Sequence, residues 1–498
     1  MRQAQFIALA AAMTVLAAGA PAQEAGPVMR LESGPALTLD DAIRLALQRN
    51  RNLKVASYEP GISRAFLLEA RGRFDPALAF SRTFSETQFS SSLGPVPVVD
   101  NTKADYYSAG IQGLLPVGTQ YSVYGSAQEV RSLYNGFSKS FQTFAGFQVT
   151  QPLLKGFGLD SNLLQVRLAK ADRSISDLTY RQSAIDTVTN VIVAYSNLQL
   201  AHDQLDSAVR ASALAASLLA ENEKEYKIGS ISQSDVIQAR ANRAQYEESI
   251  LIADRSVRDA QNQLRELIGE STFFEDEPLF TLVPAPVPEV AVDRKADLER
   301  AFRMRPDYQV KRLGIVQKRA TESAAVNSLL PQVDFVGGYG YNGLADNFRA
   351  SRQMVQDHLN PSVSAGLTVT IPLTFSVGRG SLRAARLQRI QAEEDLRRLE
   401  ADIAVAVAAA EGQIETARKR VAADRAAYDL AKQALEAEEK KKKAGTSSTL
   451  YVVQEQNFVA SIENSLSFAL AAQRQAVAVF DQALGATLER HNIKFAED

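Results

Sequence analysis

Residue patterns that would support catalysis or phosphate binding are scarce in this chain. The nearest approach to a phosphate-binding loop is Val377-Gly378-Arg379-Gly380-Ser381, which lacks the Walker spacing. Neither a G-x-S-x-G nucleophile elbow nor an H-E-x-x-H zinc motif occurs. Acidic pairs stand on polar helical segments and not in the apolar surroundings that raise the pKa of a catalytic carboxyl. We therefore expect no enzymatic activity.

Metal-binding and redox-active residues are equally sparse. The 498 residues include no cysteine and only three histidines, His202, His358 and His491. Without cysteine, disulfides, thiolate zinc sites, iron–sulfur clusters and cysteine nucleophiles are excluded. We interpret His202 as a packing or lumen residue of a long helix, because no second metal-binding side chain lies near it in the sequence. We expect no cofactor and no metal.

The charge balance argues against nucleic acid as a partner. Lys and Arg total 55 and Asp and Glu total 57, which gives a net charge of −2. The run Lys440 to Lys443 is a local exception. It is either a docking surface for an acidic partner, a charge in a vestibule, or a solvated helix end where the dipole favours lysine.

The N-terminus predicts export. Arg2 is followed by the apolar run 6–18 and by Ala20-Pro21-Ala22, which predicts cleavage after Ala22. We assign 1–22 to a secretory signal peptide, because the run is shorter than the roughly 20 residues of a membrane-spanning helix. No later segment reaches that length without charges, so the exported chain is either soluble or inserts as a β-barrel.

Landmark residues recur in the same order in the two halves of the chain. In pairs they are Pro76 and Pro331, Pro152 and Pro372, Gly229 and Gly445, and Gly269 and Gly485. Order and spacing are kept together, which predicts two internal repeats. The first repeat is 23–270 and the second is 294–486, with a linker at 271–293 and a C-terminal tail at 487–498.

Each repeat is predicted to run from a helix into a β segment and then into two long helices. The β segments are 77–152 and 332–373, and the long helices are 160–227, 232–268, 380–440 and 449–484. A helix of about 65 residues spans roughly 100 Å, which exceeds the width of one soluble domain. Such a helix needs a long partner, and the antiparallel helix after each glycine turn supplies one.

The β segments alternate in the way that barrel strands do. Leu367-Thr368-Val369-Thr370-Ile371 alternates strictly between apolar and polar residues, and aromatic residues are concentrated in 80–147. Segments of about ten residues fit tilted strands that cross a bilayer. Arg82 falls on the apolar side and counts against a barrel, and a soluble sandwich would alternate equally well.

This combination resembles the outer membrane efflux protein (TolC) family. The signal peptide, the two helix–strand–strand–helix–helix units, the strand exits at Pro152 and Pro372 and the tips at Gly229 and Gly445 are the matching features. The resemblance implies an α+β membrane protein of the bacterial outer membrane. It would be a homotrimer whose subunits share one transmembrane β-barrel, in contact with outer-membrane lipid and continued through the periplasm by a long antiparallel α-helical barrel.

The resemblance also implies a function and its residues. The protein would be a passive conduit of a tripartite efflux or type I secretion system, opened by a periplasmic adaptor (membrane fusion protein) and an inner-membrane pump. The family positions gripped by the adaptor correspond here to Ile228, Gly229 and Ser230 and to Ala444, Gly445 and Thr446. Family members often carry acidic residues at the periplasmic aperture, where this chain has Tyr451 and Gln454.

Closure of that aperture is expected to use Tyr451 packing and Gln454 hydrogen bonds. Asp235 either adds a charge to the aperture or is an ordinary first-turn acid favoured by the helix dipole. The cargo is not decided by the sequence. A periplasmic coiled-coil structural or adhesion protein without channel activity is the alternative of another class.

The first β region is much longer than the second and contains a predicted hairpin, 106–114 and 120–129, around Pro116-Val117-Gly118. The usual four strands per subunit would give a twelve-stranded trimer, and this hairpin in the wall would make it eighteen. We expect the hairpin to lie outside the wall, because a wider barrel must still fit the same helical tube.

Overall fold

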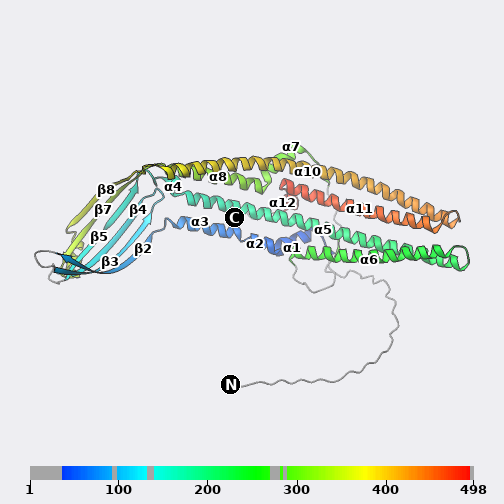
Figure 1. The fold of residues 1–498 in the computed structure, drawn as a ribbon, viewed down its shortest axis with the longest axis horizontal. Helices are drawn as coiled ribbons and strands as arrows, with labels where there is room; N and C mark the ends of the chain where they lie inside the picture. The colour runs from blue at the N-terminus through cyan, green and yellow to red at the C-terminus, as the bar shows by residue number, and fades with distance from the viewer. Residues whose placement is uncertain (1–35, 92–97, 132–138, 270–280, 284–288, 494–498) are drawn as a thin grey trace, which may run out of the picture.

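The chain is long and thin, with a β-sheet at one end and paired helices that run from it to two hairpin tips (Figure 1). The computed structural model describes residues 36–91, 98–131, 139–269, 281–283 and 289–493. The expected signal peptide, 1–22, lies outside the described residues. So do much of the predicted linker and the last residues of the predicted tail.

Six strands form one antiparallel sheet in the order β2-β3-β4-β5-β7-β8. Their bounds are β2 Ala77–Ser91, β3 Val98–Leu114, β4 Gln120–Arg131, β5 Lys139–Pro152, β7 Gln332–Ala345 and β8 Pro361–Thr370. Both halves of the chain therefore contribute to the same sheet, and β2 and β8 are its two open edges. A small second sheet pairs β1 (Ala36–Leu37) with β6 (Thr281–Leu282) in parallel.

The expectation that the extra hairpin lies outside the wall is wrong. Strands β3 and β4 are interior members of the sheet: β3 pairs along its length with β2 and over 103–114 with β4, and β4 pairs along its length with β3 and β5. Their turn is made by Gly118 at φ +98°, a left-handed conformation that favours glycine, and Leu115 N–H donates to the Thr119 carbonyl at 2.8 Å. Inside the sheet the main-chain groups of both strands find partners, which an outlying hairpin would leave half unpaired.

The β segment expected at 332–373 is interrupted by a helix. After β7, the helix α9 (Phe348–Gln356) precedes β8. The Asn347 side chain caps it by accepting from Ala350 N–H at 2.9 Å. The two strands of this segment are expected at 332–342 and 362–373, and the structure places α9 in the predicted loop between them.

Strand register divides the sheet into an apolar face and a polar face. Alternate residues share a face, and the register carries that alternation across all six strands. On the apolar face lie Leu78, Phe80, Phe84, Tyr107, Ile111, Tyr121, Val123, Phe147, Val149, Phe335, Tyr339, Val363, Leu367 and Val369. On the polar face lie mainly Ser, Thr, Gln, Gly and Ala.

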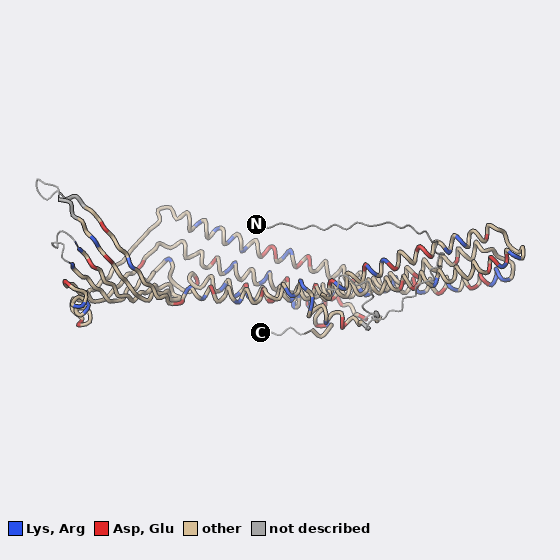
Figure 2. Tube along the Cα trace, turned by 90° about the horizontal axis from the view of Figure 1, so that it is seen from below, with Lys and Arg blue, Asp and Glu red and all other residues tan. Residues whose placement is uncertain are grey.

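Arg82 also lies on the apolar face, but it is paired. Its Nε and Nη2 atoms each lie 3.1 Å from an Asp105 carboxylate oxygen, and its guanidinium stands 5.3 Å from the centre of the Tyr107 ring. Charged residues on the strands cluster toward the ends far from the helices (Figure 2). The objection that Arg82 raised against a membrane barrel is therefore weakened.

The helices form two long hairpins with shorter helices beside them. The bounds are α1 Leu39–Arg49, α2 Arg51–Ala56, α3 Glu59–Gly72, α4 Leu159–Asn162, α5 Leu164–Lys227, α6 Gln233–Ile268, α7 Arg294–Met304, α8 Pro306–Asn327, α10 Ser376–Lys443, α11 Thr449–Leu484 and α12 Thr487–Arg490. Helices α5 and α10 have 64 and 68 residues, so each extends about 100 Å. No helix in the described part of the chain combines the length and apolarity needed to cross a membrane.

Apolar contacts between the long helices make the core. One cluster joins α5 and α6 through residues such as Ile185, Leu198 and Leu264, and another joins α10 and α11 through residues such as Val407 and Phe480. The Tyr195 hydroxyl is buried in the first cluster and donates to the Leu37 carbonyl at 2.9 Å. Burial raises the pKa of Tyr195 to about 12, so it remains a neutral donor that fixes the small sheet onto α5.

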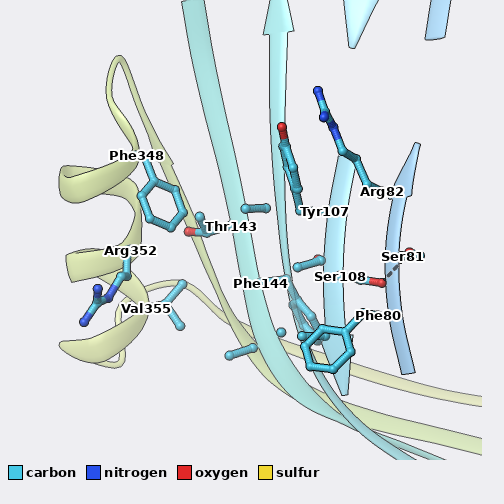
Figure 3. A pocket seen from close by; sticks show the side chains of 15 residues that line it. Phe80, Ser81, Arg82, Tyr107, Ser108, Thr143, Phe144, Phe348, Arg352 and Val355 are labelled. Carbon is cyan, nitrogen blue, oxygen red and sulfur yellow. Dashed lines mark hydrogen bonds between the residues drawn. The ribbon is translucent and has the colours of Figure 1, made fainter. Parts of the chain in front are cut away.

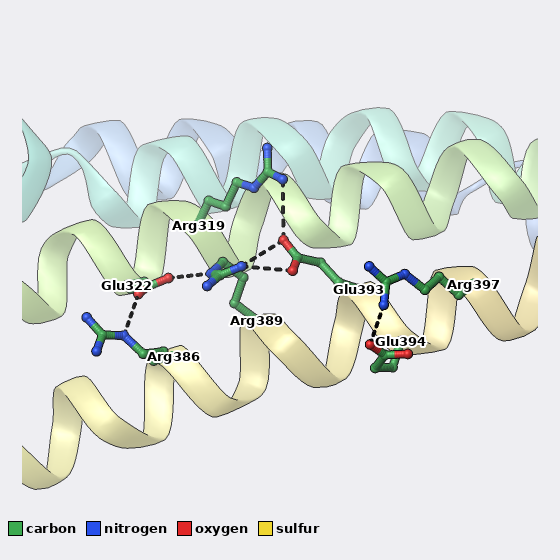
Figure 4. A network of polar contacts seen from close by, with 7 residues as sticks. All are labelled: Arg319, Glu322, Arg386, Arg389, Glu393, Glu394 and Arg397. Atoms are coloured by element: carbon green, nitrogen blue, oxygen red, sulfur yellow. Dashed lines mark hydrogen bonds and ion pairs between the residues drawn. The ribbon is translucent and has the colours of Figure 1, made fainter.

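Charged side chains hold α8 against α10 near the sheet (Figure 4). Arg389 on α10 contacts Glu322 of α8 at 2.6 Å and both oxygens of Glu393 at 2.8 Å. Arg386 and Arg319 extend the network at 3.2 and 3.3 Å. Hydrogen bonds from Arg389 lower the pKa of both Glu322 and Glu393, so the network is charged at neutral pH.

Candidate functional site

Both hairpins turn through the same local geometry. The glycines Gly229 and Gly445 have φ values of +72° and +75°. In the first tip Ser230 N–H donates to the Glu225 carbonyl at 2.9 Å, and in the second Thr446 N–H donates to the Lys441 carbonyl at 3.0 Å. These are Schellman caps, in which glycine takes the left-handed position at low cost.

The six predicted tip residues are all exposed. Ile228, Gly229 and Ser230 form one tip, and Ala444, Gly445 and Thr446 form the other. Ile228 is the most conspicuous, because this apolar side chain is 80% exposed. The two tips lie side by side at the end of the molecule opposite the sheet, in both views (Figures 1 and 2). Their use as a docking surface stays a prediction.

A buried polar cluster joins the two hairpins just above the tips. The Asn222 side chain is fully buried, and its Oδ1 accepts from Lys442 Nζ at 3.0 Å and from Thr449 Oγ1 at 3.3 Å. Its Nδ2 donates to the Asp235 carbonyl at 3.4 Å. We call Asn222, Lys442 and Thr449 the Asn222 cluster. It links α5, α6, α10 and α11 through one amide side chain.

Lys442 has a different environment from the rest of the Lys440–Lys443 run. Its side chain is only 10% exposed, and its Nζ lies 3.9 Å from Glu221 and 3.8 Å from Glu225. Lys440, Lys441 and Lys443 are exposed, and Lys441 pairs with Glu438 at 2.9 Å. Neither a docking surface nor a solvated helix end describes Lys442, which instead bridges the two hairpins.

A small apolar core lies one to two helix turns from the Asn222 cluster. Leu218, Leu435, Val452 and Val453 form a small core shared by α5, α10 and α11. Asn222 lies four residues after Leu218 on the same helix face, where the pattern of the helix calls for an apolar side chain. A lone Asn at an apolar seam position is the sequence signal that would have identified this cluster, because such residues specify pairing between helices.

The three residues predicted for the aperture have two kinds of environment, a helix cap for Asp235 and an exposed helix surface for Tyr451 and Gln454. The Asp235 carboxylate accepts from Ser232 N–H at 3.1 Å and from Ser232 Oγ at 2.6 Å, while Asp235 N–H donates to Ser232 Oγ at 3.3 Å. This is a capping box at the start of α6. On α11, Tyr451 is 56% exposed and Gln454 is exposed, so both side chains point away from the core of the chain.

Among the residues that the structure describes, no group of three or more metal-ligating side chains gathers in one place. What the tip region offers is a mechanical arrangement. Two exposed turns of equal geometry are joined by one buried polar cluster.

A family model and several solved structures match this chain. The model of the outer membrane efflux protein family matches residues 42–270 and 298–486. A search of curated protein sequences found no significant match. Among solved structures, the outer-membrane channel OprN superposes with a TM-score of 0.69 at 15% identity, covering 90% of each chain.

Two further channels resemble the chain in fold. The CmeC outer membrane channel of Campylobacter jejuni has a TM-score of 0.66 at 14% identity, covering 90% of this chain and 86% of that one. The open state of the Neisseria gonorrhoeae MtrE outer membrane channel has a TM-score of 0.64 at 19% identity, covering 90% and 89%. Because the family model spans most of the sequence, the chain belongs to the outer membrane efflux protein family.

Proposed function

We propose that this protein is the outer-membrane conduit of a tripartite efflux or type I secretion system. Family membership gives an outer-membrane channel with its helical part in the periplasm. One observation supports the fuller proposal best. A sheet with one apolar face is continuous with two helical hairpins that extend about 100 Å from it. The protein does no chemistry, and a pump in the inner membrane supplies the energy.

The proposal includes a homotrimer. Strands β2 and β8 are open edges in a single chain, and an open edge in a bilayer leaves main-chain groups unpaired at high cost. Three copies that pair β8 of one with β2 of the next close an eighteen-stranded barrel. The order of helix, strands and two long helices in each half of the chain supports two internal repeats within each subunit.

The proposal also assigns a role to the hairpin tips. A periplasmic adaptor grips the exposed turns around Gly229 and Gly445, and Tyr451 and Gln454 project toward the neighbouring copies to close the aperture. The Asn222 cluster holds the second hairpin against the first. Opening then requires that these contacts between hairpins are released.

Planar-bilayer recording of the detergent-purified protein tests the proposal. The wild-type protein is expected to give small, definite conductance steps. Asn222→Ala leaves the Lys442 ammonium without its amide acceptor, which costs about 1–3 kcal/mol and loosens the second hairpin. We expect a several-fold higher conductance or open probability from this variant.

Asn190→Ala is the matched control, because Asn190 is an exposed residue of the same helix. It is expected to conduct like the wild type. Equal conductance of all three proteins would contradict the role of the Asn222 cluster. A protein that stays in solution without detergent and never conducts would contradict the channel itself and favour a structural coiled-coil protein.

A further inference from the structure

Helix α9 folds back onto the apolar face of the sheet. Ser351 is completely buried, and its hydroxyl lies 2.7 Å from the Thr143 hydroxyl of β5. The rings of Phe348 and Phe141 meet edge to face at 6.5 Å. A side chain at Gly343 of β7 would collide with the Ser351 carbonyl, since its Cβ would stand only 1.9 Å away. The close packing of α9 against β7 therefore depends on that glycine.

A groove runs between α9 and the strands (Figure 3). Its volume is about 560 Å³, within the range of small-molecule sites. The lining is mostly apolar and includes Phe80, Tyr107, Ala109, Ala127, Ala145 and Val355. Phe348 and Val355 lie beside the groove, whereas Arg352 points away from the strands (Figure 3).

This groove lies where the apolar face gives way to charge. Register places Thr143 and Gly343 in one row with Arg82 and Ala127. Toward the far strand ends the same face carries the ion pairs Arg82–Asp105, Lys103–Glu86 and Arg131–Glu129. Such a boundary on a lipid-facing surface is the level at which acyl chains end and headgroups begin.

Two arginines of α9 lack the partners that the strand cations have. Arg349 and Arg352 are exposed and stand three residues apart, on neighbouring positions of the helix surface. Neither forms an ion pair with any residue in the described ranges, whereas Arg82, Lys103 and Arg131 are each paired on the sheet. Arg352 borders the groove and Arg349 stands three residues before it, so these two unpaired guanidinium groups are complementary to an anionic headgroup attached to an acyl chain.

We propose that α9 and this groove bind a phosphorylated, multiply acylated lipid of the outer leaflet. One acyl chain lies in the groove against Ala109, Ala127 and Val355, and a headgroup phosphate accepts hydrogen bonds from Arg349 and Arg352. In this arrangement α9 lies at the boundary between acyl chains and headgroups, with its apolar side toward the acyl chains, as amphipathic interfacial helices do. The inference rests on the proposed orientation of the apolar face toward lipid, and not on the conduit's cargo.

Native mass spectrometry of the detergent-purified protein with added lipid A provides the test. Wild-type protein is expected to retain diphosphorylated lipid A and to bind the dephosphorylated form far less. Arg349→Gln combined with Arg352→Gln is expected to weaken retention roughly tenfold or more, because two charge-assisted contacts are lost. Arg255→Gln combined with Arg258→Gln removes the same charge from exposed positions of α6 and should change nothing.

A groove-filling variant separates the acyl chain from the phosphate. Ala127→Phe is expected to weaken lipid A retention while both arginines remain. Equal retention by wild type and both variants would overturn the site. Displacement of lipid A by inorganic phosphate alone would show a simple anion site and would also overturn it.

Measuring the channel conductance of the same preparations tests the lipid site and the proposed function separately. Normal channel steps without lipid retention would refute the lipid site alone. Lipid retention without channel steps would refute the conduit alone. The oligomer mass seen in the same spectra shows whether each variant has folded and assembled.

Discussion

At the scale of single residues, polar groups inside the helical part have the largest expected effects. Asp481 on α11 is buried, and its Oδ2 lies 2.7 Å from Arg490 Nε. Its other oxygen has no hydrogen-bond partner among the described residues. Burial raises the pKa of Asp481 from 3.8 to about 6, in spite of the nearby arginine.

This pKa shift predicts a pH dependence of stability. The folded state holds the Asp481 proton more tightly than the unfolded state, so its contribution is favourable at low pH and is lost as the pH rises from about 4 to about 6. Asp481→Asn is neutral at every pH. It is expected to be more stable than wild type at pH 8 by about 2 kcal/mol.

Circular dichroism melts at pH 5 and pH 8 would measure the difference. Asp429→Asn, at an exposed position of α10, serves as the control and should follow the wild type at both values. If Asp481→Asn were no more stable than wild type at pH 8, burial of the ionised carboxylate would not destabilise the protein.

Tyr451 supplies a second prediction at this scale. Its ring is 56% exposed in a single chain, so a closed aperture would bury apolar surface between copies. Tyr451→Ala is expected to raise the single-channel conductance, while Tyr451→Phe keeps the ring and should conduct like the wild type. Unchanged conductance of Tyr451→Ala would remove the residue from the closure.

At the scale of elements, the glycine turns decide where each hairpin reverses. Gly445 has φ +75°, a conformation that a side chain occupies only at a cost of about 1 kcal/mol. Gly445→Ala is expected to destabilise the second tip by about that amount and to speed amide hydrogen exchange around it. Gly412 lies within α10 with open space at its Cβ position.

Gly412→Ala is therefore the opposite control. It is expected to stabilise the helix by roughly 0.5–1 kcal/mol, because alanine has the higher helix propensity. Denaturant unfolding combined with hydrogen exchange distinguishes the two outcomes. If Gly445→Ala did not speed amide exchange at the tip, the left-handed turn would contribute little to the stability of the hairpin.

At the scale of the whole molecule, the two open edges of the sheet place the strongest constraint on how copies assemble. A sheet that ends in β2 and β8 needs a neighbour on both sides. The sequence contains no cysteine, so introduced cysteines cannot form disulfides with native ones. Ser364→Cys on β8 can be combined in turn with Ser81→Cys, Thr83→Cys or Ser85→Cys on β2.

One of these pairs is expected to bring two Cα atoms within disulfide distance across the subunit boundary. Oxidation should then give a covalent trimer on a denaturing gel. Ser364→Cys alone is the control and should remain monomeric there. If every combination remained monomeric, closure of an eighteen-stranded barrel through β2 and β8 would be wrong.

Local patterns already determined much of this protein. Apolar spacing and the glycines Gly229 and Gly445 predicted the two helical hairpins, and the family resemblance that they supported is confirmed. These features can be predicted from the sequence because helix formation and turn geometry depend on neighbouring residues. The aperture and tip assignments remain predictions, since they concern copies and partners outside a single chain.

Only the tertiary structure decided which distant segments meet. Whether β3 and β4 lie in the wall depends on their pairing with β2 and β5. The role of Lys442 depends on Asn222, which is 220 positions away in the chain. The return of α9 onto Thr143 joins residues 208 positions apart. Contacts of this kind depend on how whole elements pack. The spacing of residues along one segment can mark a position such as Asn222, but it does not specify which distant residue that position meets.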